Sequence, residues 1–176
     1  EAAAALGSVP LGSTTSVSLG FDAAAFPAPV VGHGYLEAGP DAAPISGVTI
    51  SSNKWVRRAP EGKVLIRAFV PDRVGALAEA PDDEILARVT GHVSSVLGAT
   101  GAPELQHVVR WTAAMPKYVV GHPQRVAQVE AALPSRIAIA GSALNGVGVP
   151  DCIADGRRVA RDMLGWLETS AQRPGH

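Results

Sequence analysis

A glycine-rich loop between an apolar segment and a helix restricts the fold of this sequence more than any other feature. The apolar run Ile137–Ala140 predicts a strand over 136–140, and three glycines follow before residue 149. Pro150 suits the first turn of a helix, where its missing N–H costs nothing, and we expect that helix to run over roughly 150–168. Since so apolar a strand fits the inside of a sheet, we expect its neighbouring strands to lie outside this chain.

The first two thirds of the chain predict an antiparallel sheet with one long helix. Alternating apolar residues and short connections indicate strands at Ser16–Phe21, Val30–Leu36, Ile45–Ser51 and Lys63–Val70. Asp82–Leu97 predicts a helix, because acidic residues begin it, apolar residues form one stripe along it, and Gly98 follows it.

Three shorter elements complete the prediction. Residues 2–6 are typical of a helix tail, and Val108–Trp111 of a short strand. A further helix begins at His122, whose simplest role is to cap that helix, and ends at Pro134. We therefore expect an α+β fold in two parts, with a β-rich portion over 8–107 and a strand–loop–helix portion over 108–176.

Composition and charge exclude several function classes. The 176 residues carry a formal net charge of −1, which gives no electrostatic footprint for nucleic acid or an anionic membrane. No apolar run is long enough to predict a transmembrane segment. Cys152 is the only cysteine and the histidines lack metal-site spacing, so we expect a cytoplasmic protein without disulfides or a metal site. The chain opens without Met, in what reads as the end of a helix, which favours a fragment of a longer protein.

The glycine loop has two readings that its residues alone leave open, a tight structural turn and one wall of a cofactor site. The dinucleotide fingerprint is absent, because the sixth position counted from Gly146 is Asp151 and the sixth from Gly32 is Glu37. Trp111 could stack beside a planar ligand, although a tryptophan at a strand end is also typical of a core.

Two motifs resemble the C-terminal part of the soluble, FAD-dependent bacterial porphyrinogen oxidases, which act on protoporphyrinogen or coproporphyrinogen III. The motifs are Arg110–Tyr118 with Val120–His122, and Ala140–Ser142 with Gly146–Ile153. Supporting segments are Gly32–Leu36, Ser51–Trp55, Lys63–Val70 and Asp82–Glu84. The resemblance covers nearly the whole chain.

The resemblance implies a fold, a cofactor and a reaction. It implies the architecture of FAD-linked amine oxidases, in which 8–107 is part of a substrate-binding domain and 108–176 is the C-terminal segment of a Rossmann-like FAD-binding domain. The residues that it places against FAD are Trp111, Val147, Gly148, Val149, Pro150 and Asp151. The implied reaction is the six-electron oxidation of a porphyrinogen to a porphyrin with O₂ as acceptor, and no catalytic side chain is assigned.

Several points stay open at the level of sequence. The N-terminal half of the FAD site is missing, so we expect this chain alone to be inactive. Another flavin amine oxidase and a non-catalytic stand-alone binding module are the alternative functions. Arg57, Arg58 and Arg67 are candidates to pair with substrate propionates, and solvated surface arginines are the simpler reading.

Overall fold

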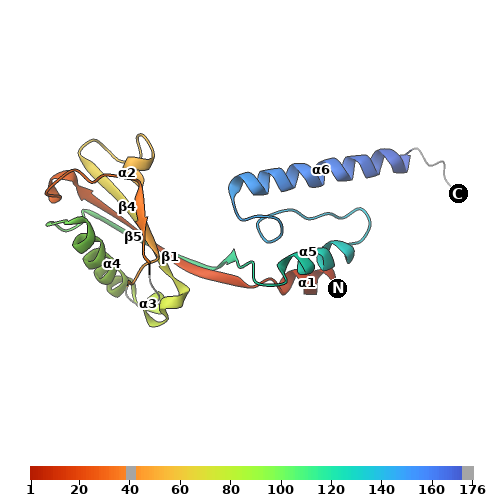
Figure 1. Ribbon diagram of the computed structural model, residues 1–176, viewed down its shortest axis with the longest axis horizontal. Coiled ribbons are helices and arrows are strands. Elements are labelled where there is room, and N and C mark those ends of the chain that lie inside the picture. The colour runs from red at the N-terminus through yellow and green to blue at the C-terminus, as the bar shows by residue number, and fades with distance from the viewer. Residues whose placement is uncertain (39–42, 172–176) are drawn as a thin grey trace. The chain divides into compact units, whose positions relative to one another are not determined.

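The computed structural model describes residues 1–38 and 43–171, and the chain divides into two compact units (Figure 1). One unit is Ser13–Ala114, and the other joins Glu1–Gly12 to Met115–His176. The chain passes from one unit to the other within β1 (Leu11–Asp22) and again within β5 (Leu105–Pro116).

A five-stranded sheet in the order β2-β3-β4-β1-β5 organises the Ser13–Ala114 unit. Its other strands are β2 (Gly34–Leu36), β3 (Gly47–Ile50) and β4 (Lys63–Pro71), and the pairs β2–β3, β3–β4 and β4–β1 are antiparallel. The antiparallel sheet predicted from the sequence is therefore confirmed. The strand expected over Val30–Leu36 is shorter than predicted, because Gly32 has a φ of 81° and the extended chain begins only after it.

The core of this unit lies between the sheet and α4 (Asp82–Leu97), which covers one of its faces (Figure 1). Alternate residues of β1 and β4 are buried there, and α4 contributes Ile85, Val89 and Val93. The bounds of α4 agree with those expected from its apolar stripe. The remaining elements are short: η1 (Ala23–Ala25), α2 (Ser51–Lys54), η2 (Asp72–Val74) and α3 (Ala76–Glu79).

Three helices form the other unit, and a long irregular segment connects two of them. They are α1 (Ala2–Gly7), α5 (His122–Ala131) and α6 (Val149–Ala171). Helices α1 and α5 pack together, and the Arg125 side chain donates from Nε to Ser8 Oγ at 3.0 Å. One sequence expectation fails here, because Gly121, not His122, is the N-cap of α5. Residues 137–140 pair with no described segment, and the strand with neighbours outside this chain stays a prediction.

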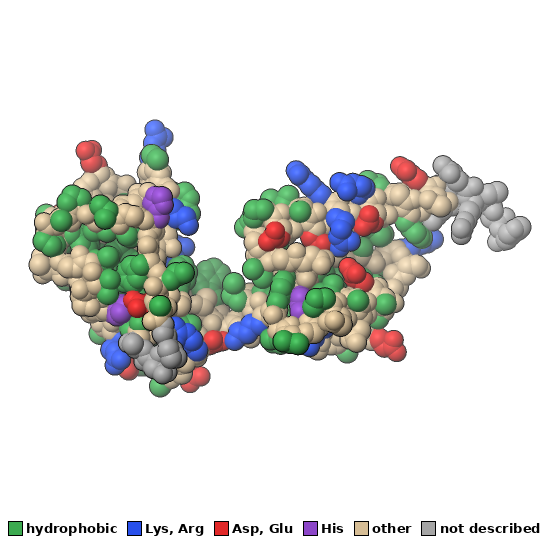
Figure 2. Space-filling model, in the orientation of Figure 1, with side chains coloured by type: hydrophobic (Ala, Val, Ile, Leu, Met, Phe, Trp, Pro, Cys, Tyr) green, Lys and Arg blue, Asp and Glu red, His purple; other side chains and the backbone are tan. Residues whose placement is uncertain are grey.

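The helical unit has a small core and much exposed apolar surface. Among its described residues, the buried apolar side chains are Val9, Val126, Val129 and Leu144. A stripe along α6 stays exposed instead, made of Val149, Ile153, Leu164 and Leu167. Figure 2 shows hydrophobic surface around the start of α6 and basic side chains further along it. Within the described parts of the chain, no helix combines the length and apolar character that crossing a membrane requires.

Replacement by alanine is expected to have opposite effects at Gly91, within α4, and at Gly98, which directly follows it. Gly98 follows the helix with a φ of 75°, a conformation that a Cβ disfavours, so Gly98→Ala is expected to destabilise the chain by about 1 kcal/mol. Gly91 lies within the helix with open space around its Cβ position, so Gly91→Ala is expected to stabilise it by about 0.5–1 kcal/mol. Urea unfolding of both variants measures the difference, and equal signs would contradict the helix end described here.

Candidate cofactor-binding site

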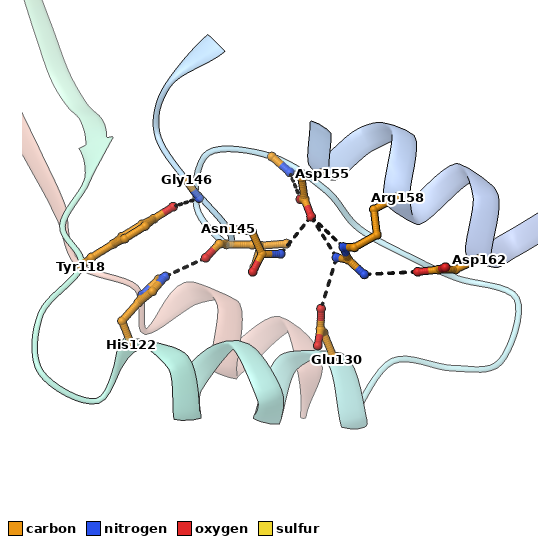
Figure 3. Close-up of polar contacts among 10 residues, drawn as sticks. Tyr118, His122, Glu130, Asn145, Gly146, Asp155, Arg158 and Asp162 are labelled. Carbon is orange, nitrogen blue, oxygen red and sulfur yellow. Dashed lines mark hydrogen bonds and ion pairs between the residues drawn. The ribbon is translucent and has the colours of Figure 1, made fainter. Parts of the chain in front are cut away.

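The loop between residues 140 and 149 is held from outside by the side chain of Tyr118 (Figure 3). The Tyr118 hydroxyl donates to the carbonyl oxygen of Ser142 at 2.7 Å and accepts from the N–H of Gly146 at 2.7 Å. One phenol therefore bridges two backbone groups on opposite sides of the loop and fixes the distance between them.

The ring of His122 contacts both the Tyr118 ring and the loop. It stacks on the Tyr118 ring with centroids 3.8 Å apart, and its Nε2 donates to the carbonyl oxygen of Leu144 at 2.9 Å. Because the partner is a carbonyl oxygen, Nε2 carries the hydrogen. His122 and Leu144 are both buried, so this bond ties the start of α5 to the middle of the loop.

The carboxylate of Asp155 joins the same loop to α6. Asp155 is 5% exposed, and it accepts from the Gly141 N–H at 3.2 Å and from Asn145 Nδ2 at 2.9 Å. Arg158 pairs with it at 2.9 Å and extends to Asp162 at 3.3 Å and to Glu130 of α5 at 3.6 Å (Figure 3). The loop, α5 and α6 are therefore connected through one buried carboxylate.

Burial and hydrogen bonding act in opposite directions on Asp155. Burial by itself raises the pKa of this carboxyl, because it disfavours the charged form. The hydrogen bonds that the carboxylate accepts, that of Arg158 foremost, outweigh burial and hold the pKa below its ordinary value. Asp155 is therefore a charged acceptor for the loop at neutral pH.

Asp151 fixes the last turn of the loop before the helix. As the third residue of α6, it reaches back so that Oδ2 accepts from the N–H of Gly148 at 3.2 Å, in the manner of a capping box. A Cβ at Gly146, whose φ is 132°, would lie 2.5 Å from Asp151 Cβ. The spacing of these glycines is thus required by the loop itself, whatever else the loop contacts.

The outer surface of the loop suits a planar, partly anionic ring. Val147 and Val149 are exposed and offer apolar surface, while Pro150 begins the helix without an N–H. No acceptor among the described residues pairs with the N–H of Val149 at the start of α6. Apolar side chains beside unpaired N–H groups match a flavin, whose ring is apolar on its faces and bears carbonyl oxygens at its edge. The residues present therefore fit such a group.

Trp111 lies in the Ser13–Ala114 unit, apart in the chain from the residues of the loop. It sits on β5, 51% exposed, and its Nε1–H donates to Ser16 Oγ at 3.2 Å. A cavity of about 400 Å³ adjoins it, lined in part by Thr14, Thr15 and Arg110. The structure thus places Val147 and Gly148 in the loop and Val149, Pro150 and Asp151 in the first turn of α6. Trp111 is exposed on β5.

Sequence reasoning missed the residues that position the loop. Tyr118 and His122 were recognised as parts of a motif and a helix start, and Asn145, Asp155 and Arg158 received no role. Tyr118 and His122 are four residues apart, which alone gives no sign that their rings stack. No group of three potential metal-ligating side chains occurs among the residues that the structure describes.

Removing the charge of Asp155 is expected to loosen the loop. Asp155→Asn should cost about 2–3 kcal/mol, because Arg158 and the Gly141 N–H lose a charged acceptor at a buried position. Asp162→Asn is the matched control, since Asp162 is exposed and its pair with Arg158 should contribute less than about 0.5 kcal/mol. Thermal unfolding compares the two, with hydrogen exchange over 137–148 as the local measure; equal losses would contradict the role of Asp155.

The same carboxylate predicts a pH dependence. Because the pKa of Asp155 is lower in the folded chain, its contribution to stability is complete above the unfolded pKa of about 3.9 and is lost as the pH falls through the folded value. The difference in unfolding free energy between wild type and Asp155→Asn should therefore shrink between about pH 5 and pH 3. Unfolding curves across this range test it, and a constant difference would contradict it.

Comparison with known proteins agrees with the resemblance found in the sequence. The chain is 50% identical over 166 residues to a coproporphyrinogen III oxidase of Propionibacterium freudenreichii, covering 93% of this chain and 31% of that protein. It is 34% identical over 160 residues to the coproporphyrinogen III oxidase of Bacillus subtilis, covering 88% of this chain and 34% of the relative. The chain therefore spans about a third of the length of these relatives.

Solved structures show the same architecture. An Exiguobacterium protein assigned as a protoporphyrinogen oxidase superposes with a TM-score of 0.75 at 28% identity, over 90% of this chain and 36% of that one. A reduced UDP-galactopyranose mutase shares the fold, with a TM-score of 0.56 at 16% identity, over 79% of this chain and 29% of that one. The family model for flavin containing amine oxidoreductases matches residues 1–164. The chain belongs to the flavin containing amine oxidoreductase family.

Proposed function

We propose that this chain is the C-terminal portion of an FAD-dependent oxidase that converts coproporphyrinogen III to coproporphyrin III. The observation that carries the proposal is the 50% identity to a coproporphyrinogen III oxidase across 93% of the chain. Protoporphyrinogen IX is the second candidate substrate, favoured by the name of the Exiguobacterium structure. A cytoplasmic location is part of the same proposal.

The proposal assigns the contacts with FAD to named residues of the chain. Val147–Asp151, at the end of the loop and the start of α6, would form one wall of the FAD site, and Trp111 is the other residue that we assign to the flavin. The division into a substrate-binding part over 8–107 and an FAD-binding part over 108–176 stays a prediction. The exposed apolar stripe of α6 supports it, because a helix with an unpartnered apolar face needs a further layer of protein. We assign that layer to the part of the longer protein that this chain does not include.

The residues of the loop have defined tasks in this reaction. Val147, Val149 and the first turn of α6 would hold a flavin on one side, and a bound flavin would supply the chemistry for hydride removal from a methylene bridge of the porphyrinogen, with O₂ as the final electron acceptor. Val147 and Val149 exclude water from their side of the site. The N–H groups at the start of α6 favour negative charge, and each such interaction stabilises it by about 0.3–1 kcal/mol. Tyr118 and Asp155 act indirectly, by holding the loop that carries these groups.

The direct test uses the longer protein that contains this segment. Loaded with FAD, it should oxidise coproporphyrinogen III to the fluorescent porphyrin, with peroxide formed in step. A panel of amines tests the alternative that it is another amine oxidase of the family. A fully FAD-loaded protein that leaves both porphyrinogens unoxidised would reject the proposal, and turnover of an amine would reassign the substrate.

This chain by itself is expected to bind FAD weakly or not at all. It lacks a dinucleotide fingerprint, and the backbone N–H groups that such a loop offers to the pyrophosphate provide much of the affinity. Titration of the isolated chain, followed by flavin fluorescence, should show no saturation in the micromolar range, and the longer protein is the control. Micromolar binding would show that the division of the FAD site is wrong, and would favour a stand-alone binding module.

A further inference from the structure

The face of the sheet opposite α4 is uncovered by any long helix of its own unit. In Ser13–Ala114 the described helices other than α4 have four residues or fewer, and α4 covers the buried face (Figure 1). The opposite face carries every second residue of each strand. Across β4 and β1, the residues that face it pair as Leu65 with Gly20, Arg67 with Ser18, and Phe69 with Ser16.

Arg67 stands in the middle of this open face. It is exposed, at the centre of β4, with Thr49 of β3 on one side and Ser18 of β1 on the other. Both neighbours are short and uncharged, so the guanidinium is flanked by hydroxyl groups. No acidic side chain among the described residues pairs with Arg67, and a cation fixed on a sheet without an acid beside it is available to an external carboxylate.

The acidic residues closest in register are already occupied. Asp22 and Glu104, at the end where β1 finishes, both bond to Lys63, at 3.0 and 2.8 Å. Their charges are thereby compensated locally. The centre of the open face keeps one net positive charge, that of Arg67.

An apolar recess adjoins Arg67 along β4. Leu65, two residues before Arg67 and on the same face, lines a cavity of about 300 Å³ together with Gly20 and Leu105. Ala59 and Pro60 close it from the loop after α2. Gly20 keeps this place open, because a Cβ there would lie 3.1 Å from Leu105 Cβ. Arg58, Lys63 and Glu104 also line the recess, and Lys63 is paired with Glu104. The face thus offers a largely apolar hollow next to Arg67.

Trp111 lies on the same face. Its indole N–H bonds to Ser16 Oγ, and Ser16 pairs with Phe69, two residues beyond Arg67 on β4. Arg67 therefore lies between the apolar recess at one end of the face and the proposed flavin-contacting tryptophan at the other.

We propose that Arg67 binds a peripheral propionate of the porphyrinogen, whose ring lies against the open face and its apolar recess. The inference rests on the proposed function, and it names the residue that recognises the substrate class. Porphyrinogens combine apolar pyrrole rings with anionic side chains, which matches this pairing of hollow and cation. Of the other two arginines considered for a propionate, Arg58 lines the recess but lies over the Trp55 ring at 5.5 Å. Arg57 precedes it in the same loop, outside the sheet. Of the three, Arg67 is the arginine that projects from the sheet itself.

The test is a charge substitution in the FAD-loaded longer protein. Arg67→Gln should raise KM for coproporphyrinogen III, and Kd for coproporphyrin III by fluorescence, about tenfold with kcat little changed, because a charge-assisted hydrogen bond to a carboxylate is lost. Arg67→Lys should recover part of the affinity. Arg88→Gln, which removes an exposed arginine from α4 on the other side of the unit, is the matched control and should change neither constant.

A porphyrin with esterified side chains separates the carboxylate contact from a general defect. Wild type and Arg67→Gln should bind coproporphyrin tetramethyl ester equally, since no carboxylate is left to pair. If the wild-type protein is active and Arg67→Gln has the same KM, the inference about Arg67 is wrong while the proposed function stands. The same holds if Arg67→Gln loses affinity equally for the acid and for the ester. Wild type that neither binds coproporphyrin nor oxidises the porphyrinogen would overturn the proposed function with it.

Discussion

The helical unit depends on the buried carboxylate of Asp155. The loop that it holds has no strand pairing and no long helix of its own, so its backbone N–H groups need acceptors from elsewhere. Asp155 accepts from Gly141 and Asn145 of the loop and, through Arg158, reaches Glu130 of α5. A neutral acceptor would make weaker hydrogen bonds, whereas the hydrogen bonds of a charged group are strong enough to offset its burial. Together with the Tyr118 bridge, this anchor holds the loop at Gly141, Ser142, Asn145 and Gly146.

The two units differ in how completely they fold. The sheet unit buries one continuous apolar cluster between β-strands and α4, which is what an independent layer of protein requires. The helical unit buries few apolar side chains and leaves the stripe of Val149, Ile153, Leu164 and Leu167 exposed. An exposed stripe of this size on one helix marks a surface that another element covers. Its partner is best sought in the two thirds of the relatives' length that this chain does not span.

Sequence patterns predicted α4 and the strands of the sheet, because these elements depend on residues close together in the chain. The bounds of α4 follow from its acidic first turn, its stripe and Gly98, and the strands follow from alternation. The strand expected over 137–140 stays a prediction, since a strand needs a partner and its neighbours were expected outside this chain. Sequence patterns also do not reveal the side chains that hold the loop, because those contacts join residues far apart in the chain. His122 reads as a helix start and Asp155 as one acid of an amphipathic helix, and their contacts with Leu144, Gly141 and Asn145 arise only once the chain folds back.

The glycines of the loop explain why its sequence allowed two interpretations, a tight structural turn and one wall of a cofactor site. Gly146 and Gly148 are required by the carboxylate of Asp151, whose side chain occupies the space that a Cβ would need. The structural turn therefore accounts for these glycines without any ligand. The same cap turns Val147 and Val149 outward and leaves an N–H free at the start of α6. The turn and the proposed cofactor wall are therefore compatible, because the interactions that close the turn leave apolar side chains exposed beside an unpaired N–H group.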